Sequence, residues 1–213
     1  MLGIHRGDRM TTLVSMDTKS FNGAKIASNH TGMEVREFAN GDQTTTMIRT
    51  EKGKTMLIEH DVMTPRPYSR MYQVVGTDGY AAKYPIGQYC LRVDKPEGAV
   101  NAKHISDEKT YSGEELKELQ AGYRNTILTP ELEKLAKEVG GHGGMDFIMD
   151  YRLVYCLRNG LPLDMDVYDL AEWCCVAPLS RISLENGCMP VEVPDFTRGA
   201  WNQVDGFHYA LAK

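Results

Sequence analysis

Segments that favour strands and segments that favour helices are segregated along this 213-residue chain. The first hundred residues contain short runs rich in Thr, Val and Met, which favour strands, separated by polar turns that carry glycine. The turn at 51–54 predicts a hairpin, and the turn at 76–79 joins two further runs. Short strands joined by tight turns predict an antiparallel sheet. The expected strands are 9–16, 44–49, 55–62, 70–75, 79–83 and 88–93.

The second half of the chain has the periodicity and the boundary signals of helices. Thr129 is a capping hydroxyl before Pro130, and Gly140 stops the helix that follows. Asp166 and Asp169 are expected to cap a later amphipathic helix. The other expected helices are 114–125 and 146–159.

Helix 146–159 is expected to be a core helix, because one of its faces is apolar. That face carries Phe147, Ile148, Tyr151, Val154 and Tyr155. Pro178 is expected to break or kink the last helix, and the polar stretch 101–113 is expected to be a loop.

Strands followed by helices predict an α+β fold, in which helices cover one face of an open, mostly antiparallel β-sheet. The length suits one large domain or two small ones, and we expect a single domain over 1–213. The net charge of −5 comes without a basic stripe, so nucleic acid is not an expected partner. No apolar run approaches the roughly 20 residues that cross a membrane, and we expect a soluble chain. Met1–Asp8 has no features of a signal peptide, and the localisation is left open.

The five cysteines are odd in number and irregular in spacing, and no C-x-x-C occurs. Cys174 and Cys175 lie in an apolar helical pattern, where buried free thiols are expected. Asp164 and Asp166 resemble a metal pair, but Asp166 is better explained as a helix cap. We therefore expect no metal site.

The glycine cluster at 140–144 encloses His142. From Gly141 it begins like the dinucleotide fingerprint G-x-G-x-x-G, but the sixth position is Asp146, whose carboxylate would repel a pyrophosphate. The cluster also follows a helix instead of a strand, so we expect no cofactor bound to this chain. One interpretation is that the glycines only stop one helix and start the next. The functional interpretation is that His142 hydrogen-bonds a substrate hydroxyl or transfers a proton.

The segment 61–70 lies between two expected strands and contains two prolines that favour an extended path. Arg66, Tyr68 and Arg70 are therefore held on a stiff connector, where guanidinium donors and an aromatic ring suit sugar recognition. The alternative is a structural edge loop with solvated arginines. His60 is expected to be structural. No role is assigned to the histidines that lack carboxylates at ligand spacing, which are His5, His30, His104 and His208.

The order of several motifs resembles the C-terminal domain of the Gfo/Idh/MocA oxidoreductase family. Within that family the motifs are most similar to glycoside hydrolase family 109, the NAD-dependent α-N-acetylgalactosaminidases. Segments 4–9 and 66–70 fit the same group. The motifs that carry the resemblance are 141–146, 160–169, 178–180 and 194–199.

This resemblance implies a parent protein in which an N-terminal Rossmann domain carries NAD and this chain is the substrate-side C-terminal domain. It also implies that NAD takes a hydride from C3 of a terminal α-N-acetylgalactosamine, that elimination expels the aglycone, and that the same cofactor returns the hydride after water adds. Homo-oligomers through the sheet are expected, since sheets in this family commonly form subunit interfaces.

Family members carry a Tyr-Pro-Thr-His stretch shortly before the segment that matches Met1, and its histidine is thought to act in catalysis. Because this chain starts after that stretch, the resemblance implies that the chain alone is inactive. Tyr68 is a candidate acid/base or sugar-contact residue, and His142 is a second candidate on the substrate side. Two alternatives remain: an ordinary NAD(P)-dependent sugar oxidoreductase, and a non-catalytic sugar-binding or oligomerisation module.

Overall fold

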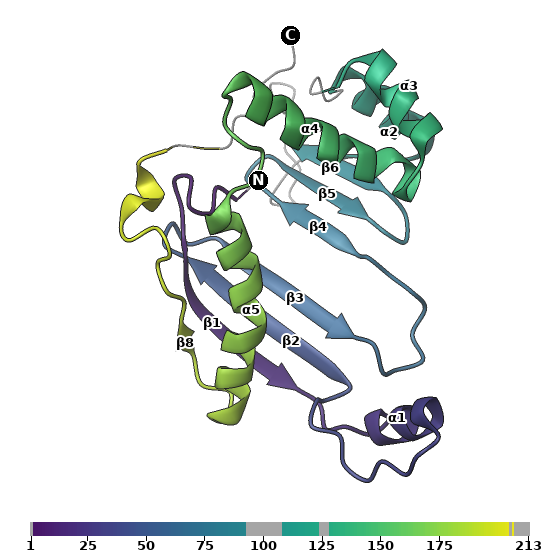
Figure 1. Cartoon of the computed structure of the whole chain (residues 1–213), viewed down its shortest axis with the longest axis vertical. Coiled ribbons are helices and arrows are strands. Elements are labelled where there is room, and N and C mark those ends of the chain that lie inside the picture. Colours follow the sequence, from purple (N-terminus) through teal and green to yellow (C-terminus); the bar gives the residue numbers. More distant parts are fainter. Residues whose placement is uncertain (1, 93–107, 124–127, 205, 207–213) are drawn as a thin grey trace, which may run out of the picture. The chain divides into compact units, whose positions relative to one another are not determined.

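A computed structural model gives the fold of residues 2–92, 108–123, 128–204 and 206. The chain divides into two compact units, the first made of 1–65 with 127–213 and the second of 66–126. Both units combine antiparallel strands with helices, and both sheets are open (Figure 1). The predicted α+β class is therefore confirmed. The single domain over 1–213 stays a prediction.

The sheet of the first unit has the strand order β3-β2-β1-β8, and all of its described neighbours are antiparallel. The expected hairpin is confirmed, since β2 and β3 pair along their lengths around the turn at 51–54. The strands are β1 (Met10–Asp17), β2 (Gln43–Thr50), β3 (Thr55–Asp61) and β8 (Val191–Glu192).

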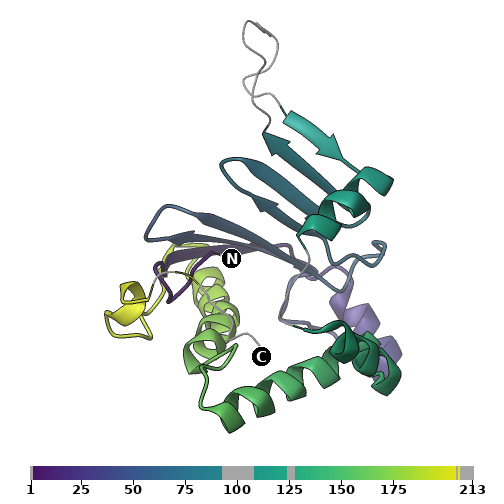
Figure 2. The same cartoon turned by 90° about the horizontal axis from the view of Figure 1, so that it is seen from above.

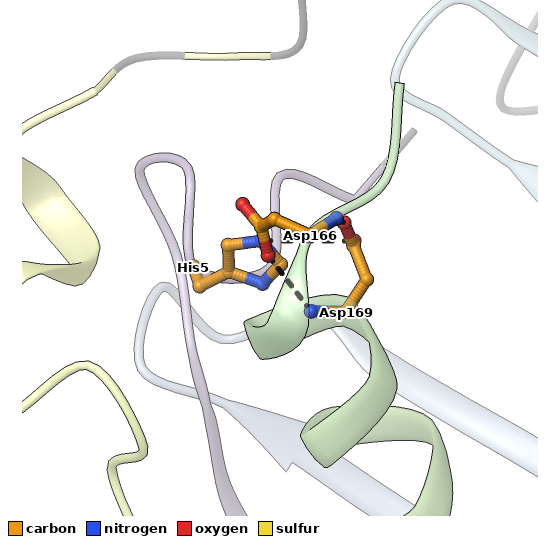
Figure 3. A group of neighbouring side chains, drawn as sticks. All are labelled: His5, Asp166 and Asp169. Carbon is orange, nitrogen blue, oxygen red and sulfur yellow. Dashed lines mark hydrogen bonds and ion pairs between the residues drawn. The ribbon is translucent and has the colours of Figure 1, made fainter. Parts of the chain in front are cut away.

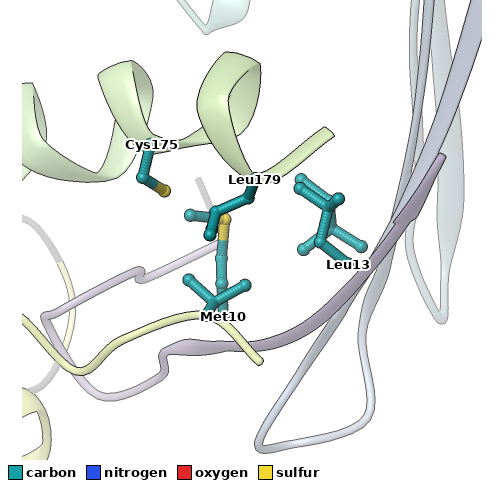
Figure 4. Close-up of a cluster of buried hydrophobic side chains, with 6 residues drawn as sticks. Met10, Leu13, Cys175 and Leu179 are labelled. Carbon is teal, nitrogen blue, oxygen red and sulfur yellow. The ribbon is translucent and has the colours of Figure 1, made fainter. Parts of the chain in front are cut away.

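Helix α5 (Val167–Glu185) covers one face of this sheet and lies against β1 (Figures 1 and 2). Apolar side chains from β1, β2, α5 and the segment after β8 form the core between them (Figure 4). A buried hydroxyl also joins the layers, because Ser183 Oγ accepts a hydrogen bond of 3.0 Å from the backbone N–H of Ser15. The core residues are Met10, Leu13, Ile48, Cys175, Leu179 and Val193.

The opposite face of the same sheet is open in the described residues. Side chains alternate between the two faces of a strand, so the neighbours of buried Leu13 and Ile48 point away from α5. Val14 pairs with Met47, and Met47 pairs with Leu57, which places three apolar residues in one row across β1, β2 and β3. Met47 is 52% exposed and Leu57 is 64% exposed.

Three further helical segments of the first unit are α3 (Pro130–Val139), η1 (His142–Gly144) and α4 (Met145–Asn159). Thr129 caps α3 as predicted, because its Oγ1 accepts from the N–H of Leu132. The predicted core face of α4 is only half-buried. Phe147, Ile148, Tyr151 and Tyr155 are half-buried and Val154 is 51% exposed, whereas the buried side chains of α4 are Arg152 and Cys156. An amphipathic pattern identifies an apolar face but not what covers it.

Helix α1 (Gly23–Thr31) was not expected from the sequence. It follows a loop whose last residues are held by Asp42, a buried carboxylate that accepts from the N–H groups of Phe21 and Asn22. The side-chain amide of Asn22 donates to the same carboxylate at 2.8 Å. The helix is therefore positioned by a residue about twenty positions away, which no local pattern reveals.

The second unit is a sheet of order β4-β5-β6-β7 with one helix, α2 (Gly113–Gly122). The turn at 76–79 is confirmed, since the N–H of Gly76 donates to the carbonyl of Gly79 at 2.7 Å. The strands are β4 (Tyr72–Val75), β5 (Gly79–Lys83), β6 (Gln88–Arg92) and β7 (Glu108–Tyr111). The predicted loop 101–113 lies partly outside the described residues. For its described part the prediction is wrong, because residues 108–111 form β7, which pairs with β6, and Gly113 begins α2. Pairing with β6 makes a strand of a stretch whose polar composition favours a loop.

Two other expectations need correction. Helix α5 runs through Pro178 without a break. Pro178 and Cys174, which supplies the carbonyl four residues earlier, are both exposed, so that carbonyl can bond to water. Cys175 is buried as expected, but Cys174 is exposed.

Among the described residues, none of the helices has the length and apolar character needed to cross a membrane.

Candidate functional site

The loop between α3 and α4 has an unusual backbone. Five consecutive residues have positive φ angles: Gly140 at 82°, Gly141 at 72°, His142 at 46°, Gly143 at 73° and Gly144 at 96°. Glycine adopts such angles at no steric cost, whereas a residue with a Cβ does so rarely. His142 is thus held in a left-handed conformation by the glycines on both sides of it, and its side chain is 76% exposed.

Two of these glycines are also required by close packing. A Cβ at Gly141 would lie 2.8 Å from the Asp146 carboxylate, and a Cβ at Gly144 would lie 2.6 Å from the carbonyl oxygen of Ala136. The space at Gly141 lets Asp146 reach back to His142, with 2.8 Å between Asp146 Oδ2 and His142 Nδ1. The glycine loop therefore builds an exposed imidazole–carboxylate pair.

The same loop does not fit a dinucleotide. A pyrophosphate needs backbone N–H groups at a helix N-terminus after a strand. Here the loop follows α3, and the Asp146 carboxylate lies close to Gly141, where it would repel a phosphate. The glycine loop therefore lacks the context of a dinucleotide fingerprint.

The predicted sugar-contact residues of segment 61–70 lie in the second unit, before β4. Tyr68 is 76% exposed, and the guanidinium of Arg70 lies 5.7 Å from the centre of its ring. Arg66 is also exposed. These three side chains are accessible to a ligand, as the prediction requires. His142 belongs to the first unit, and the assignment of all four residues as site residues stays a prediction.

A second polar cluster joins the N-terminal loop to the start of α5 (Figure 3). His5 Nε2 lies 3.4 Å from Asp166 Oδ1 and 3.6 Å from Asp169 Oδ1. Arg6 also binds Asp169 through both carboxylate oxygens, at 3.0 and 2.9 Å. The sequence gives no sign of this cluster, because about 160 residues separate the histidine from the two aspartates.

The His5–Asp166–Asp169 cluster has the ligand types of a metal site, but its oxygens are already engaged. Asp166 Oδ1 accepts the N–H groups of Tyr168 and Asp169 and so caps α5, as predicted. Arg6 neutralises Asp169, and a divalent cation beside that guanidinium would be repelled. Burial, reinforced by Arg6, lowers the pKa of His5 against the opposing pull of the two aspartates. This cluster therefore anchors the N-terminal loop.

Glu172 lies one turn further along α5 and is 5% exposed. Its Oε2 has no hydrogen-bond partner among the described residues. Burial, with the charges of Asp195 and Asp169, raises the pKa of Glu172 to about 7. It is therefore a buried carboxyl group that changes its charge near neutral pH.

An open pocket of about 500 Å³ lies beside β1, β2 and β8 in the first unit. Its two arginines are matched by two glutamates, so it presents no net charge to a ligand, and none of the predicted site residues lines it. The lining residues are Arg9, Thr11, Thr12, Arg49, Thr50, Glu51, Pro190, Val191 and Glu192.

The comparison with known families gives a match over nearly the whole chain. Residues 1–203 match the family described as Glycosyl hydrolase 109, C-terminal domain. The chain is 64% identical to Glycosyl hydrolase family 109 protein 1 of Bacteroides thetaiotaomicron over 215 aligned residues. It is 61% identical to a Glycosyl hydrolase family 109 protein of Porphyromonas gingivalis. Both alignments cover 100% of this chain and 46% of the relative, so the chain spans about half the length of the curated relatives it matches.

Two solved structures have a similar fold. One is an oxidoreductase domain protein from Kribbella flavida, with a TM-score of 0.51 and 14% identity, covering 88% of this chain and 47% of that chain. The other is an NAD binding oxidoreductase from Klebsiella pneumoniae, with a TM-score of 0.51 and 16% identity, covering 87% of this chain and 46% of that chain. At this identity the likeness concerns the fold alone.

Proposed function

Because this chain belongs to the glycosyl hydrolase 109 C-terminal domain family, we propose that it is the substrate-side half of an NAD-dependent glycosidase that releases terminal α-N-acetylgalactosamine. The observation that carries the proposal is the family match over residues 1–203, with relatives of the same family at 64% and 61% identity. The relatives are about twice as long, which leaves room in them for a separate cofactor domain.

In this proposal NAD supplies reversible oxidation of the sugar and is held outside this chain. The chain itself contributes the wall of the sugar site. Tyr68 donates or accepts a proton near the reacting carbon, and Arg66 and Arg70 donate hydrogen bonds to sugar oxygens. His142 contacts a further hydroxyl. The exposure of all four side chains supports this role.

A chimera tests the proposal, in which this chain is joined to the part of the Bacteroides thetaiotaomicron relative that it does not match. With NAD bound, the chimera is expected to cleave an aryl α-N-acetylgalactosaminide. Tyr68→Phe should lower kcat about 100-fold if the phenol transfers a proton. His142→Ala should lower kcat/KM about tenfold, as loss of one substrate hydrogen bond implies.

The matched controls are Tyr123→Phe and His60→Ala. Tyr123 is 78% exposed, about as much as Tyr68, and His60 is an exposed histidine on β3. Both variants should keep the activity of the unsubstituted chimera. A folded chimera that binds NAD but cleaves no N-acetylgalactosaminide would contradict the proposal. Net reduction of NAD by a free sugar would favour the alternative, an ordinary sugar oxidoreductase, which the fold likeness to an NAD binding oxidoreductase brings into consideration.

We also propose that the open face of the β3-β2-β1-β8 sheet joins two copies of this chain. Exposed apolar patches on monomers are usually small, and larger ones mark interaction surfaces. The row of Val14, Met47 and Leu57 lies in the middle of this face. Nucleic acid and membranes are not proposed as partners, given the net charge of −5 without a basic stripe.

Leu57→Glu is expected to convert a dimer of this chain into a monomer, because each copy would bury an unpaired glutamate in the interface. Sedimentation equilibrium measures the change. Val139→Glu is the control, since Val139 is 60% exposed at the end of α3 and away from the sheet. If the unsubstituted chain is monomeric at high concentration, or if Leu57→Glu stays dimeric, the sheet is not the interface.

A further inference from the structure

The contact between His142 and Asp146 determines where the imidazole carries its proton. Nδ1 of His142 lies 2.8 Å from Asp146 Oδ2 and 3.1 Å from Asp146 Oδ1. An ionised carboxylate only accepts hydrogen bonds, so the ring nitrogen that faces it has to donate. When the imidazole is neutral it has a single N–H, and that N–H is therefore on Nδ1. Nε2 is left with its lone pair.

We propose that Asp146 is a positioning residue that holds the neutral imidazole of His142 as the Nδ1–H tautomer and so presents Nε2 to the ligand as a hydrogen-bond acceptor. This inference rests on the proposed function, since it concerns the proposed contact between His142 and the sugar. The ligand would contact Nε2 of His142 in its unprotonated form, and Asp146 would determine that form.

The backbone geometry of the loop indicates that the contact between His142 and Asp146 is fixed by the fold and is not a chance contact on the surface. A helix often ends at one residue with a positive φ angle, whereas this loop has five such residues in a row, with the histidine at their centre. A non-glycine residue held in such a conformation is typical of sites where the surrounding structure fixes a functional geometry. Gly141 has no Cβ in the space that the Asp146 carboxylate occupies. The loop therefore holds His142 at an unfavourable φ angle while the contact between His142 and Asp146 is formed.

The pair also selects the chemistry of its ligand. An Nε2 lone pair accepts a hydrogen bond from a hydroxyl or an amide N–H, and it can take the proton of a hydroxyl. The carboxylate behind it disfavours phosphate and carboxylate groups. The ligand group expected at His142 is therefore an uncharged hydroxyl or amide of a sugar.

Nuclear magnetic resonance of the ring nitrogens tests the inference on the full 213-residue chain. In the neutral form of His142, the Nε2 resonance is expected at the downfield position of an unprotonated nitrogen, and Nδ1 at the upfield position of a protonated one. Asp146→Ala removes the acceptor and should move Nε2 upfield and Nδ1 downfield.

Asp150→Asn is the matched control, because Asp150 is an exposed aspartate one turn further along α4. It should leave both resonances of His142 unchanged, and the exposed His30 on α1 serves as an internal reference. A spectrum of the unsubstituted chain with Nε2 protonated would overturn the inference. So would an Asp146→Ala variant that folds and keeps the original tautomer.

The two failures can be told apart. The tautomer is measured in the absence of substrate and cofactor, so the test of the inference does not depend on enzymatic activity. If the chimera cleaves no sugar while His142 is the Nδ1–H tautomer, the proposed function fails and the inference about Asp146 stands. If the chimera is active while Nε2 is protonated, the reverse holds.

Discussion

Replacing Glu172 by glutamine is expected to stabilise the fold by about 3 kcal/mol near pH 8, and by less than about 1 kcal/mol near pH 5. The reason is the rise of the Glu172 pKa from 4.5 to about 7 in the folded chain, caused first by burial and then by the charges of Asp195 and Asp169. The folded state holds this proton more tightly than the unfolded state. Between these two pKa values, stability is therefore lost as the pH rises.

The measurement is the free energy of unfolding in urea as a function of pH for the original chain and for Glu172→Gln. Glutamine has the shape of the neutral acid and no charge to lose, so the difference between the two curves isolates Glu172. Glu59→Gln is the control, because Glu59 is an exposed glutamate on β3, and it should shift stability by no more than about 0.5 kcal/mol at any pH. Parallel curves for the original chain and Glu172→Gln would contradict the assignment.

The second large effect is expected at Arg152, the buried arginine of α4. Its Nε and one terminal nitrogen donate to the two oxygens of Asp164 at 2.8 and 2.7 Å. The Arg152 side chain is 4% exposed and that of Asp164 is 21% exposed. Removal of one member of such a pair leaves a desolvated charge without compensation. Arg152→Met should therefore lower the free energy of unfolding by about 3 kcal/mol.

A double variant separates the ion pair from the packing of the side chain. Arg152→Met with Asp164→Leu should recover most of the loss, because no buried charge remains. The control pair is Arg181 and Glu185 on α5, exposed and four residues apart, where Arg181→Met should cost about 0.5 kcal/mol or less. Denaturant unfolding measures these three variants against the original chain. An Arg152→Met chain as stable as Arg181→Met would show that the buried pair contributes nothing.

The fold class and six of the eight described strands could be predicted from the sequence, because strands and turns have local signals, whereas β7 and β8 were missed. The hairpin around 51–54 and the caps at Thr129 and Asp166 follow from residue types at fixed spacing. Helix α1 could not be predicted, because Asp42 positions it through contacts over about twenty residues. The buried face of α4 was also mispredicted, since periodicity does not show that Arg152 is buried with Asp164.

At the candidate site, too, some features could be predicted from the sequence and others could not. The exposure of His142 could be predicted from the glycines around it, but its pairing with Asp146 could not. From the sequence, Asp146 is interpreted only as a residue that repels a pyrophosphate. The four-residue spacing between His142 and Asp146 allows a contact at a helix start but does not by itself establish one. The cluster of His5 with Asp166 and Asp169 depends entirely on the tertiary fold. Contacts between distant segments leave no periodic signal in a single sequence.

We propose that this chain is the substrate-side half of a glycosidase that uses NAD without consuming it. Two products can be followed at once in the chimera, which are free N-acetylgalactosamine and reduced cofactor. We expect many turnovers of sugar release with no net accumulation of NADH, and no release by this chain alone. Stoichiometric accumulation of NADH with the aglycone still attached would contradict this proposal, and would identify the parent as a sugar dehydrogenase.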